Sequence, residues 1–345
     1  MSEEIPYRRR PRYSGKYPRR FEEKYKELSP QKYPDTVAKV LASGKTPAGS
    51  HVPVMVEEIL EVLRPQPGET AVDCTLGHGS HAEAILQRVQ PGGRLLGLDV
   101  DPVELPRTEA RLRALGFGPE VFKIRKSNFA GLPGALAAEE LAAADCVLAD
   151  LGVSSMQLDT PERGFSTKTP GPLDMRMNPK RGMSAAQFLK NISRHALETL
   201  LVENADEPRA GILSAALAGR EFVLTTDLSQ AVRAVLYALP EDEQDKCIRR
   251  VFQGIRIAVN EEFSALDSLL RVLPHCLSPG GRVAILSFHS GEDRRVKKAF
   301  QAGLRDGIYS KIADAITRPT PEECRANPRA ASAKLRWARK QDFSK

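Results

Sequence analysis

From about residue 51 onward, short apolar runs alternate with stretches whose apolar positions recur at helical spacing. The short runs have the length and bounding residues of buried strands, and the longer stretches those of amphipathic helices. The predicted strands are residues 70–73, 94–99, 121–125 and 146–150, and the predicted helices are residues 54–63, 82–89 and 104–115. Strands that alternate with helices predict an α/β fold, a parallel sheet covered by helices on both faces.

This alternation stops near Gln157 and resumes near residue 256. The interval carries helical patterns and no convincing strand, and its predicted helices are residues 185–190, 195–203, 211–218, 228–239 and 243–260. After it come a helix at 263–273, a strand at 282–288 and a helix at 292–304. A helical block that interrupts an α/β sheet indicates an inserted subdomain. We therefore predict three parts: a leader at 1–48, a core at 49–157 and 256–345, and a helical insert at 158–255.

The predicted leader differs from the rest in composition, with Arg and Tyr interleaved with several prolines. It buries too little apolar surface to offset its ordering entropy, so we expect a flexible segment. Arg can pair with phosphates and Tyr can stack on bases, which favours weak RNA affinity over an idle tail. The net charge of +7 supports this interpretation, although a well-solvated surface would carry the same charge.

The five cysteines are scattered, and none has metal-ligand spacing. We therefore expect neither a metal site nor a disulfide framework. Reduced thiols, the lack of an apolar run of membrane-spanning length and an N-terminus unlike a secretory signal together favour a cytoplasmic protein that does not enter a membrane. The composition leaves open whether the chain forms a homodimer.

The ends of the first two predicted strands carry the features of a nucleoside site. Asp73 closes the first strand, and the following turn contains Gly77 and Gly79, where backbone can approach a ligand closely. Asp99 closes the second strand, and a carboxylate there can accept hydrogen bonds from both ribose hydroxyls of an adenosine cofactor. The neighbouring Asp101 is expected to cap the next helix instead.

The same turn limits which cofactor fits. Ser80 and Ala82 stand where a G-x-G-x-x-G turn would have its third glycine, and no P-loop lysine pattern occurs. A dinucleotide pyrophosphate needs that turn and a helix N-terminus to neutralise its charge, whereas S-adenosylmethionine carries no phosphate. The spacing therefore favours S-adenosylmethionine and leaves a nicotinamide dehydrogenase as a weaker alternative.

Eight short runs resemble those of one family, and they occur in the family's order over residues 50–340. They are His51-Val-Pro-Val, Asp73-Cys-Thr-Leu-Gly-His-Gly-Ser-His81, Asp99-Val-Asp-Pro102, Asp150-Leu-Gly-Val-Ser-Ser-Met-Gln-Leu-Asp159, Arg163-Gly-Phe-Ser166, Gly171-Pro-Leu-Asp-Met-Arg-Met177, Phe288-His-Ser-Gly-Glu-Asp-Arg294 and Asn327-Pro-Arg-Ala-Ala-Ser-Ala-Lys-Leu-Arg336. The chain resembles the bacterial 16S ribosomal RNA cytosine-N4 methyltransferase family of the MraW type.

The resemblance implies a class I (Rossmann-like) methyltransferase sheet with an inserted all-helical subdomain that recognises the substrate. It implies S-adenosylmethionine-dependent N4-methylation of a cytidine in the decoding region of 16S rRNA, with small-subunit ribosomal RNA or the 30S subunit as partner. Within the cofactor pocket, Phe129 would contact the adenine ring and Asp150 would lie near the methionine end. By position, the residues implied to line that pocket are Gly79, Ser80, His81, Asp99, Phe129, Asp150 and Gln157.

The chain departs from the family's usual pattern at three places. Ser80 stands where the first turn usually has a second glycine, and Gly291 stands where a leucine usually precedes Glu-Asp-Arg. In the insert, residues 203–208 replace an expected Tyr-Gly-Glu-Glu stretch, which puts the RNA contacts of the insert in doubt but not the cofactor site.

Four polar residues are candidates for the chemistry at N4: Asp150, Asp174, Arg176 and His289. Asp150 ends the fourth strand, where amino-methyltransferases often carry Asp-Pro-Pro-Tyr. The Pro-Pro-Tyr is absent here, so proton acceptance by Asp150 is a hypothesis beside its role as a cofactor ligand. The alternative for Asp174 and Arg176 is an ion pair that ties a loop, and for His289 a buried histidine bonded to backbone.

Basic residues at the insert and in the C-terminal part favour phosphate contacts, among them Arg249 and Arg256 on about one face of a predicted helix. Two other functions compete with the RNA methyltransferase. A DNA amino-methyltransferase of the same fold is disfavoured by the missing Pro-Pro-Tyr. A non-catalytic ribosome assembly factor that only holds S-adenosylmethionine is disfavoured by the presence of both Asp99 and Asp150.

Overall fold

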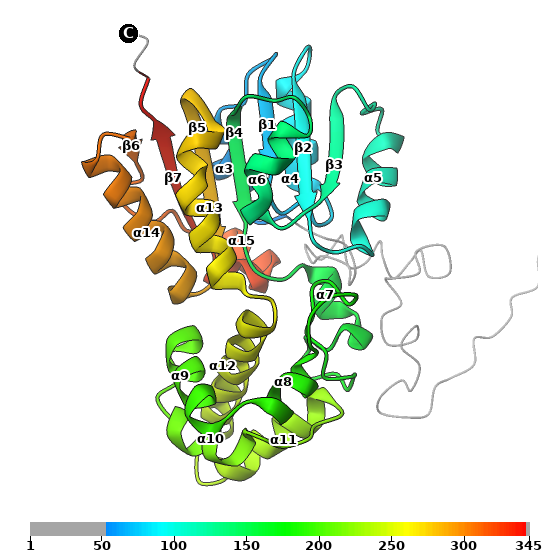
Figure 1. Cartoon of the computed structure of the whole chain (residues 1–345), viewed down its shortest axis with the longest axis vertical. Helices are drawn as coiled ribbons and strands as arrows, with labels where there is room; N and C mark the ends of the chain where they lie inside the picture. Colours follow the sequence, from blue (N-terminus) through cyan, green and yellow to red (C-terminus); the bar gives the residue numbers. More distant parts are fainter. Residues whose placement is uncertain (1–52, 343–345) are drawn as a thin grey trace, which may run out of the picture. The chain divides into compact units, whose positions relative to one another are not determined.

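A seven-stranded sheet with the strand order β3-β2-β1-β4-β5-β7-β6 forms the centre of the structure (Figure 1). The structure is a computed structural model and describes residues 53–342, so the predicted leader at 1–48 lies outside the described residues. The strands are β1 (Thr70–Asp73), β2 (Arg94–Asp99), β3 (Phe122–Lys126), β4 (Ala144–Asp150), β5 (Leu277–Ser287), β6 (Tyr309–Ile312) and β7 (Lys334–Lys340). This topology confirms the expected methyltransferase sheet.

The first five strands pair in parallel, as predicted, and their ends therefore meet at one edge. The last two strands, β6 and β7, were not among the predicted strands, and β7 pairs antiparallel with both β5 and β6. The sequence pattern missed β7 because four of its seven residues are Lys or Arg. Its apolar residues Leu335 and Ala338 are nevertheless fully buried, on opposite faces of the sheet.

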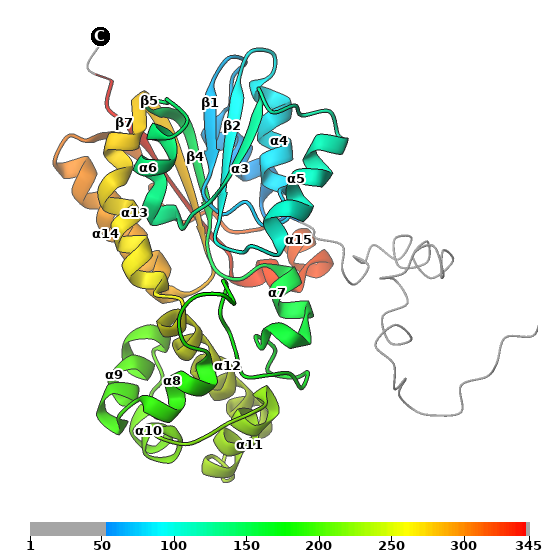
Figure 2. The same ribbon diagram turned by 45° about the vertical axis from the view of Figure 1, so that its right-hand side comes forward.

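Successive residues along the inner strands face opposite helix layers, as the two-residue period of a strand requires. Val72 and Val147 pack against α6, α13 and α14, whereas Ala71 and Leu148 pack against α3, α4 and α5. Figures 1 and 2 show the two helix layers on either side of the sheet. The helices of the core are α3 (Val56–Leu63), α4 (Ser80–Val89), α5 (Glu104–Ala114), α6 (Leu132–Ala137), α7 (Ser155–Asp159), α13 (Glu262–Cys276), α14 (Ser290–Arg305) and α15 (Pro321–Ala326).

The segment between α7 and α13 is helical, as predicted, and has an apolar core of its own. Its helices are α8 (Ala185–Asn191), α9 (Arg194–Ala205), α10 (Ala210–Leu217), α11 (Thr225–Val235) and α12 (Glu241–Val259). The predicted boundary between residues 255 and 256 falls inside α12, whose last turn reaches the core (Figure 2). No helix within residues 53–342 has both the length and the apolar character needed to cross a membrane.

Candidate functional site

A cleft of about 500 Å³ lies where the carboxyl ends of β1, β2 and β4 face the last turns of α12. Ligands of open α/β sheets bind at this edge. The cleft is also lined by the start of α14 and by residues 327–332, so its wall combines segments from both ends of the described chain. Gly79, Ser80, His81, Asp99, Phe129, Asp150 and Gln157, the seven residues predicted to line the cofactor pocket, all line this cleft.

The turn after β1 is built around Gly79, which precedes α4 with a φ of 80°. A Cβ at this position would lie 2.7 Å from Cγ2 of Thr108, so only glycine fits both the backbone conformation and the space. Ser80 is the first residue of α4 and does not have a positive φ. The family's second glycine is therefore not needed here, because Ser80 adopts helical backbone that any residue can adopt.

Asp99 has the geometry expected of a ribose ligand. Its Oδ2 accepts a hydrogen bond from the Gly77 N–H at 2.8 Å, and its Oδ1 accepts one from the Asp101 N–H at 2.9 Å. Burial raises the pKa of Asp99, while these two N–H groups act in the opposite direction. Each carboxylate oxygen has a further lone pair, so the site can still accept both hydroxyls of a ribose. The residues present therefore fit an adenosine-containing cofactor.

Asp101 does more than the predicted helix capping. Its Oδ1 accepts a hydrogen bond from the Val103 N–H at 2.9 Å, just before α5 begins. Its Oδ2 accepts one from Gln157 Nε2 at 2.9 Å and one from Arg163 Nη1 at 2.8 Å. Asp101 is 1% exposed, so it is a buried junction between β2, α7 and the entrance of the insert.

Gln157 contributes to the wall of the cleft with an amide that is already bonded at both ends. Its Oε1 accepts a hydrogen bond from the Ser154 N–H at 3.0 Å, within a capping box that starts α7, and its Nε2 donates to Asp101. Phe129 begins a short 3₁₀ helix (Phe129–Gly131), which the Asn128 side chain caps at 2.9 Å. Its contact with adenine stays a prediction.

Asp150 and His81 lie together at the deep end of the cleft. Nε2 of His81 lies 2.9 Å from the Val54 carbonyl oxygen, which can only accept, so Nε2 carries the hydrogen and Nδ1 carries the lone pair. Nδ1 lies 3.7 Å from Oδ2 of Asp150. The other oxygen, Oδ1, is buried and has no hydrogen-bond partner within residues 53–342. A buried carboxylate oxygen without a hydrogen bond destabilises the folded protein, unless a bound ligand donates a hydrogen bond to it.

The electrostatics of this pair favour uncharged side chains. Burial, and secondarily the negative charge of Glu292, raises the pKa of Asp150 to about 7. Burial likewise lowers the pKa of His81, against the attraction of Asp73 and Glu323. Asp150 is therefore poised to change its protonation state near neutral pH.

His289 lies between β5 and α14 and lines the opposite wall of the cleft. Its Nδ1 accepts a hydrogen bond from the Glu292 N–H at 3.4 Å, which caps α14. Its Nε2 is buried and makes no hydrogen bond in the described part of the chain, although it lies 3.2 Å from Oε1 of Glu292. Burial alone would raise the pKa of Glu292, but His289, Arg256 and the Phe288 N–H together lower it.

Gly291 departs from the family pattern because Phe263 occupies the space beside it. A Cβ at Gly291 would lie 2.6 Å from Cζ of Phe263, and the Phe263 ring packs against His289 with a centroid distance of 5.6 Å. Phe263 is 8% exposed, so it has little room to move away.

Gly291→Leu is expected to lower the free energy of unfolding by about 1–3 kcal/mol, because the new side chain overpacks against Phe263. Combined with Phe263→Leu, it should cost less than the sum of the single changes, as measured by urea denaturation in a double-mutant cycle. Gly134→Leu is a matched control, since no atom lies within 4 Å of a Cβ there. Additive effects of the two changes would contradict the steric explanation.

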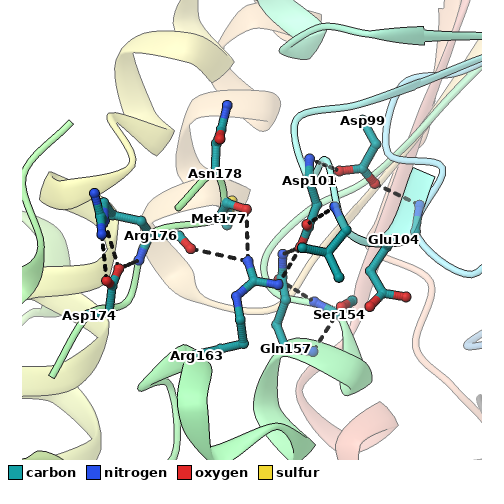
Figure 3. A network of polar contacts seen from close by, with 12 residues as sticks. Asp99, Asp101, Glu104, Ser154, Gln157, Arg163, Asp174, Arg176, Met177 and Asn178 are labelled. Carbon is teal, nitrogen blue, oxygen red and sulfur yellow. Dashed lines mark hydrogen bonds and ion pairs between the residues drawn. The ribbon is translucent and has the colours of Figure 1, made fainter. Parts of the chain in front are cut away.

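Asp174 and Arg176 do not line the cleft. Oδ1 and Oδ2 of Asp174 accept hydrogen bonds from Nε and Nη2 of Arg176 at 2.8 Å and 2.7 Å (Figure 3). The carbonyl oxygen of Asp174 also accepts a hydrogen bond from the Ala185 N–H at the start of α8. This geometry supports the loop-tying alternative for the pair, and a catalytic role for either residue stays a prediction.

One face of α12 supplies residues to the cleft that the sequence analysis only partly anticipated. Its members, spaced by three or four positions as one helix face requires, are Arg249, Gln253, Arg256 and Asn260. Arg256 is held by Glu262 through two hydrogen bonds of 2.8 Å and 2.9 Å, whereas Arg249 is exposed. Helical spacing predicted the shared face of the two arginines, but the sequence analysis assigned no role to Gln253 or to Asn260, which follows the last turn.

Two further cleft residues lie in runs that carried the family resemblance without a role being assigned to them. Arg329 pairs with Asp159 through hydrogen bonds of 3.2 Å and 2.6 Å, and Asn327 begins the same C-terminal segment. Arg163 stands just behind the cleft and binds Asp101. Within residues 53–342, no group of three or more His, Cys, Asp or Glu side chains is arranged to hold a metal ion.

The chain is similar in sequence to known proteins over almost its whole length. The model of the MraW methylase family matches residues 48–341. Ribosomal RNA small subunit methyltransferase H 1 of Lachnoclostridium phytofermentans is 49% identical, over 98% of this chain and 94% of that protein. Ribosomal RNA small subunit methyltransferase H 2 of Alkaliphilus metalliredigens is 51% identical, over 96% of this chain and 97% of that protein. Ribosomal RNA small subunit methyltransferase H 1 of Agathobacter rectalis is 48% identical, over 98% of this chain and 99% of that protein.

The family match confirms the relationship indicated by the eight sequence runs. It also confirms, together with the strand order, the expected methyltransferase fold and S-adenosylmethionine as the methyl donor. Because the match spans almost the whole chain and the relatives are about half identical to it, the chain belongs to the MraW methylase family.

Proposed function

We propose that this protein transfers a methyl group from S-adenosylmethionine to the exocyclic N4 of a cytidine in small-subunit ribosomal RNA, within the decoding region of 16S rRNA. The observation that carries the proposal is the unpartnered Oδ1 of Asp150, a buried acceptor that shares one cleft with the ribose ligand Asp99. An amine that gains a methyl group must lose a proton, and this oxygen is available to take it. The names of the relatives support the RNA substrate.

S-adenosylmethionine supplies an electrophilic methyl group when it is bound. The proposed task of this chain is to hold it in one orientation: Asp99 binds the ribose, Phe129 covers the adenine and the turn at Gly79 allows close approach of backbone. His81 and Gln157 support this arrangement from behind, because their polar atoms already bond to Val54 and to Asp101. The methionine end then lies towards Asp150.

The N4 amine of cytosine is a weak nucleophile, because its lone pair is delocalised into the ring. Most of the acceleration must therefore come from alignment, and the base must leave its stack to reach the cleft. Oδ1 of Asp150 accepts one N4 hydrogen and then the proton that leaves. A pKa of about 7 suits a group that accepts a proton at neutral pH. His289 also lines the cleft, with its Nε2 3.2 Å from Oε1 of Glu292, and its proposed part is to hold the Glu292 carboxylate beside the base.

Arg249 is the proposed phosphate contact at the cleft. It lines the cleft, is exposed and makes no hydrogen bond or ion pair with any residue that the structure describes. Arg249→Ala should weaken RNA binding uniformly across sequences and lower the slope of log affinity against log salt by about 1, measured by filter binding. Arg271→Ala, an exposed arginine on α13 outside the cleft, is the control and should leave the slope unchanged. Equal slopes for both variants would exclude a phosphate contact at Arg249.

The proposed function is tested by nucleoside mass spectrometry. Small ribosomal subunits that lack the modification are incubated with the protein and S-adenosylmethionine, and their RNA is digested and mapped. N4-methylcytidine in the decoding region is the expected product. Methylation of a different nucleotide would refute the assigned target. No methylated nucleoside on subunits or on naked 16S RNA, despite confirmed cofactor binding, would instead favour a non-catalytic assembly factor.

A further inference from the structure

A chain of buried polar contacts links the nucleoside end of the cleft to the insert, and Arg163 is at its centre (Figure 3). Nη1 of Arg163 donates to Oδ2 of Asp101 at 2.8 Å, and Nη2 donates to the carbonyl oxygens of Arg176 and Met177 at 3.2 Å and 2.8 Å. The side chains of Arg163 and Asp101 are only 12% and 1% exposed. A guanidinium buried to this degree is held by a specific set of acceptors.

The same series of hydrogen bonds continues from Met177 to the end of α12. The Met177 N–H donates to Oδ1 of Asn260 at 2.7 Å. Nδ2 of Asn260 donates in turn to the carbonyl oxygens of Met175 and Arg256, at 2.8 Å and 2.9 Å. Met177 and Asn260 both line the cleft that Asp99 lines, and Asn260 is bonded to Arg256. We call Met177 and Asn260 the insert wall.

At its other end, this series of hydrogen bonds reaches Asp99, the proposed ligand of the ribose. The Asp101 N–H donates to Oδ1 of Asp99, and the Asp101 side chain receives Arg163. A ligand bound at Asp99 therefore rests on the residue that anchors Arg163. A ligand that fixes the Asp99 carboxylate also fixes the Asp101 backbone that is bonded to it, and with it the carboxylate that holds Arg163. Arg163 in turn holds the carbonyl groups of residues 176 and 177.

We infer that Arg163 is a positioning residue that fixes the insert wall against the end of β2, so that binding of the cofactor at Asp99 orders the wall on which the substrate base will lie. The inference rests on the proposed function for the place of the ribose at Asp99 and for the identity of the base. Coupling of this kind is reciprocal, so a base bound against Met177 and Asn260 also favours the cofactor. The contacts that transmit it are those of one fork-shaped side chain, which a lysine cannot reproduce.

The test measures hydrogen exchange at the backbone amides of residues 175–178, with and without S-adenosylhomocysteine. In the wild-type protein the ligand should slow exchange of the Met177 amide by about tenfold, within the usual range of coupling between sites. In Arg163→Lys, which keeps the positive charge beside Asp101, the ligand should still bind but the gain in protection should be largely lost. Arg163→Met should lose it completely.

Arg233→Met serves as the matched control, because it removes an Arg–Asp pair of the insert that does not line the cleft. This variant should show the wild-type gain. An undiminished gain in Arg163→Lys, or no gain in the wild-type protein, would overturn the inference. If Arg163→Met does not fold, Arg163→Lys still decides the question. No RNA is present, so failure of the proposed RNA methylation would not change these results.

A second measurement distinguishes the inferred role of Arg163 from a purely structural one. Loss of stability alone would lower kcat and cofactor affinity together, and would not depend on the RNA. The inferred role predicts that Arg163→Lys raises the KM for RNA more than it changes the Kd for S-adenosylhomocysteine measured without RNA. Equal effects on both constants would contradict it.

Discussion

Asp99→Ala is expected to reduce the affinity for S-adenosylhomocysteine by about 100-fold or more, while the protein stays folded. The variant loses the carboxylate that would accept two ribose hydroxyls, and each hydrogen bond to a charged group contributes about 1.5–3 kcal/mol. It also leaves the N–H groups of Gly77 and Asp101 without their acceptor, so the turn after β1 loses its tie to β2. Isothermal titration calorimetry with S-adenosylhomocysteine measures the change.

Two further variants test whether the loss of affinity is due to the Asp99 carboxylate in particular. Asp99→Asn keeps one acceptor oxygen and should show an intermediate loss. Asp145→Asn changes a carboxylate near the opposite end of β4, where Oδ2 accepts the Thr70 N–H, and should bind the ligand like the wild-type protein. Wild-type affinity in Asp99→Ala would show that the ribose is bound elsewhere.

Asp150→Asn should lower the rate of methyl transfer by about 100-fold or more, because general-base assistance is removed. The affinity for the cofactor should fall less, because the amide keeps one acceptor oxygen at the methionine end. The pH profile gives the sharper test. Since burial raises the pKa of Asp150 to about 7, the carboxyl group is protonated below that pH and cannot accept a proton from N4. The wild-type rate should therefore rise as pH increases through about 7, and the rate of Asp150→Asn should lack this rise.

The raised pKa of Asp150 also predicts how stability depends on pH: the rate should rise with pH, whereas the contribution of Asp150 to stability should fall. A carboxyl group whose pKa is higher in the folded state binds more protons when folded, so its contribution to stability falls as pH rises from the unfolded value towards about 7. Asp150→Asn removes this contribution and should gain stability relative to the wild type above neutral pH, as urea denaturation can measure. An identical pH dependence in both proteins would refute the raised pKa. Burial, and in smaller part the charge of Asp150, also raises the pKa of Asp73, so replacing Asp150 changes the contribution of Asp73 in the same direction.

Much of the strand–helix order, and the residues at one end of the cleft, could be predicted from the sequence. The predicted strands 70–73 and 94–99 agree with β1 and β2 at both ends, because short apolar runs bounded by turn residues are recognised from local pattern alone. The places of Gly79 and Asp99 in the cleft were also predicted from local pattern, since Asp99 ends β2 and Gly79 lies in the turn between β1 and α4. Parallel strands bring such positions to one edge of the sheet whatever the loops do.

Which polar side chains come into contact could not be predicted from the sequence, because it depends on how distant segments pack together. Asp174 and Arg176 are candidates for the chemistry, and they bind each other. Asn260, to which the sequence analysis assigned no role, lines the same cleft as Asp99 and binds Met177 from 83 positions away. Local periodicity sets the face of a helix or strand on which a side chain lies. It does not set the partner of that side chain, because the partner depends on how segments distant in sequence pack against one another.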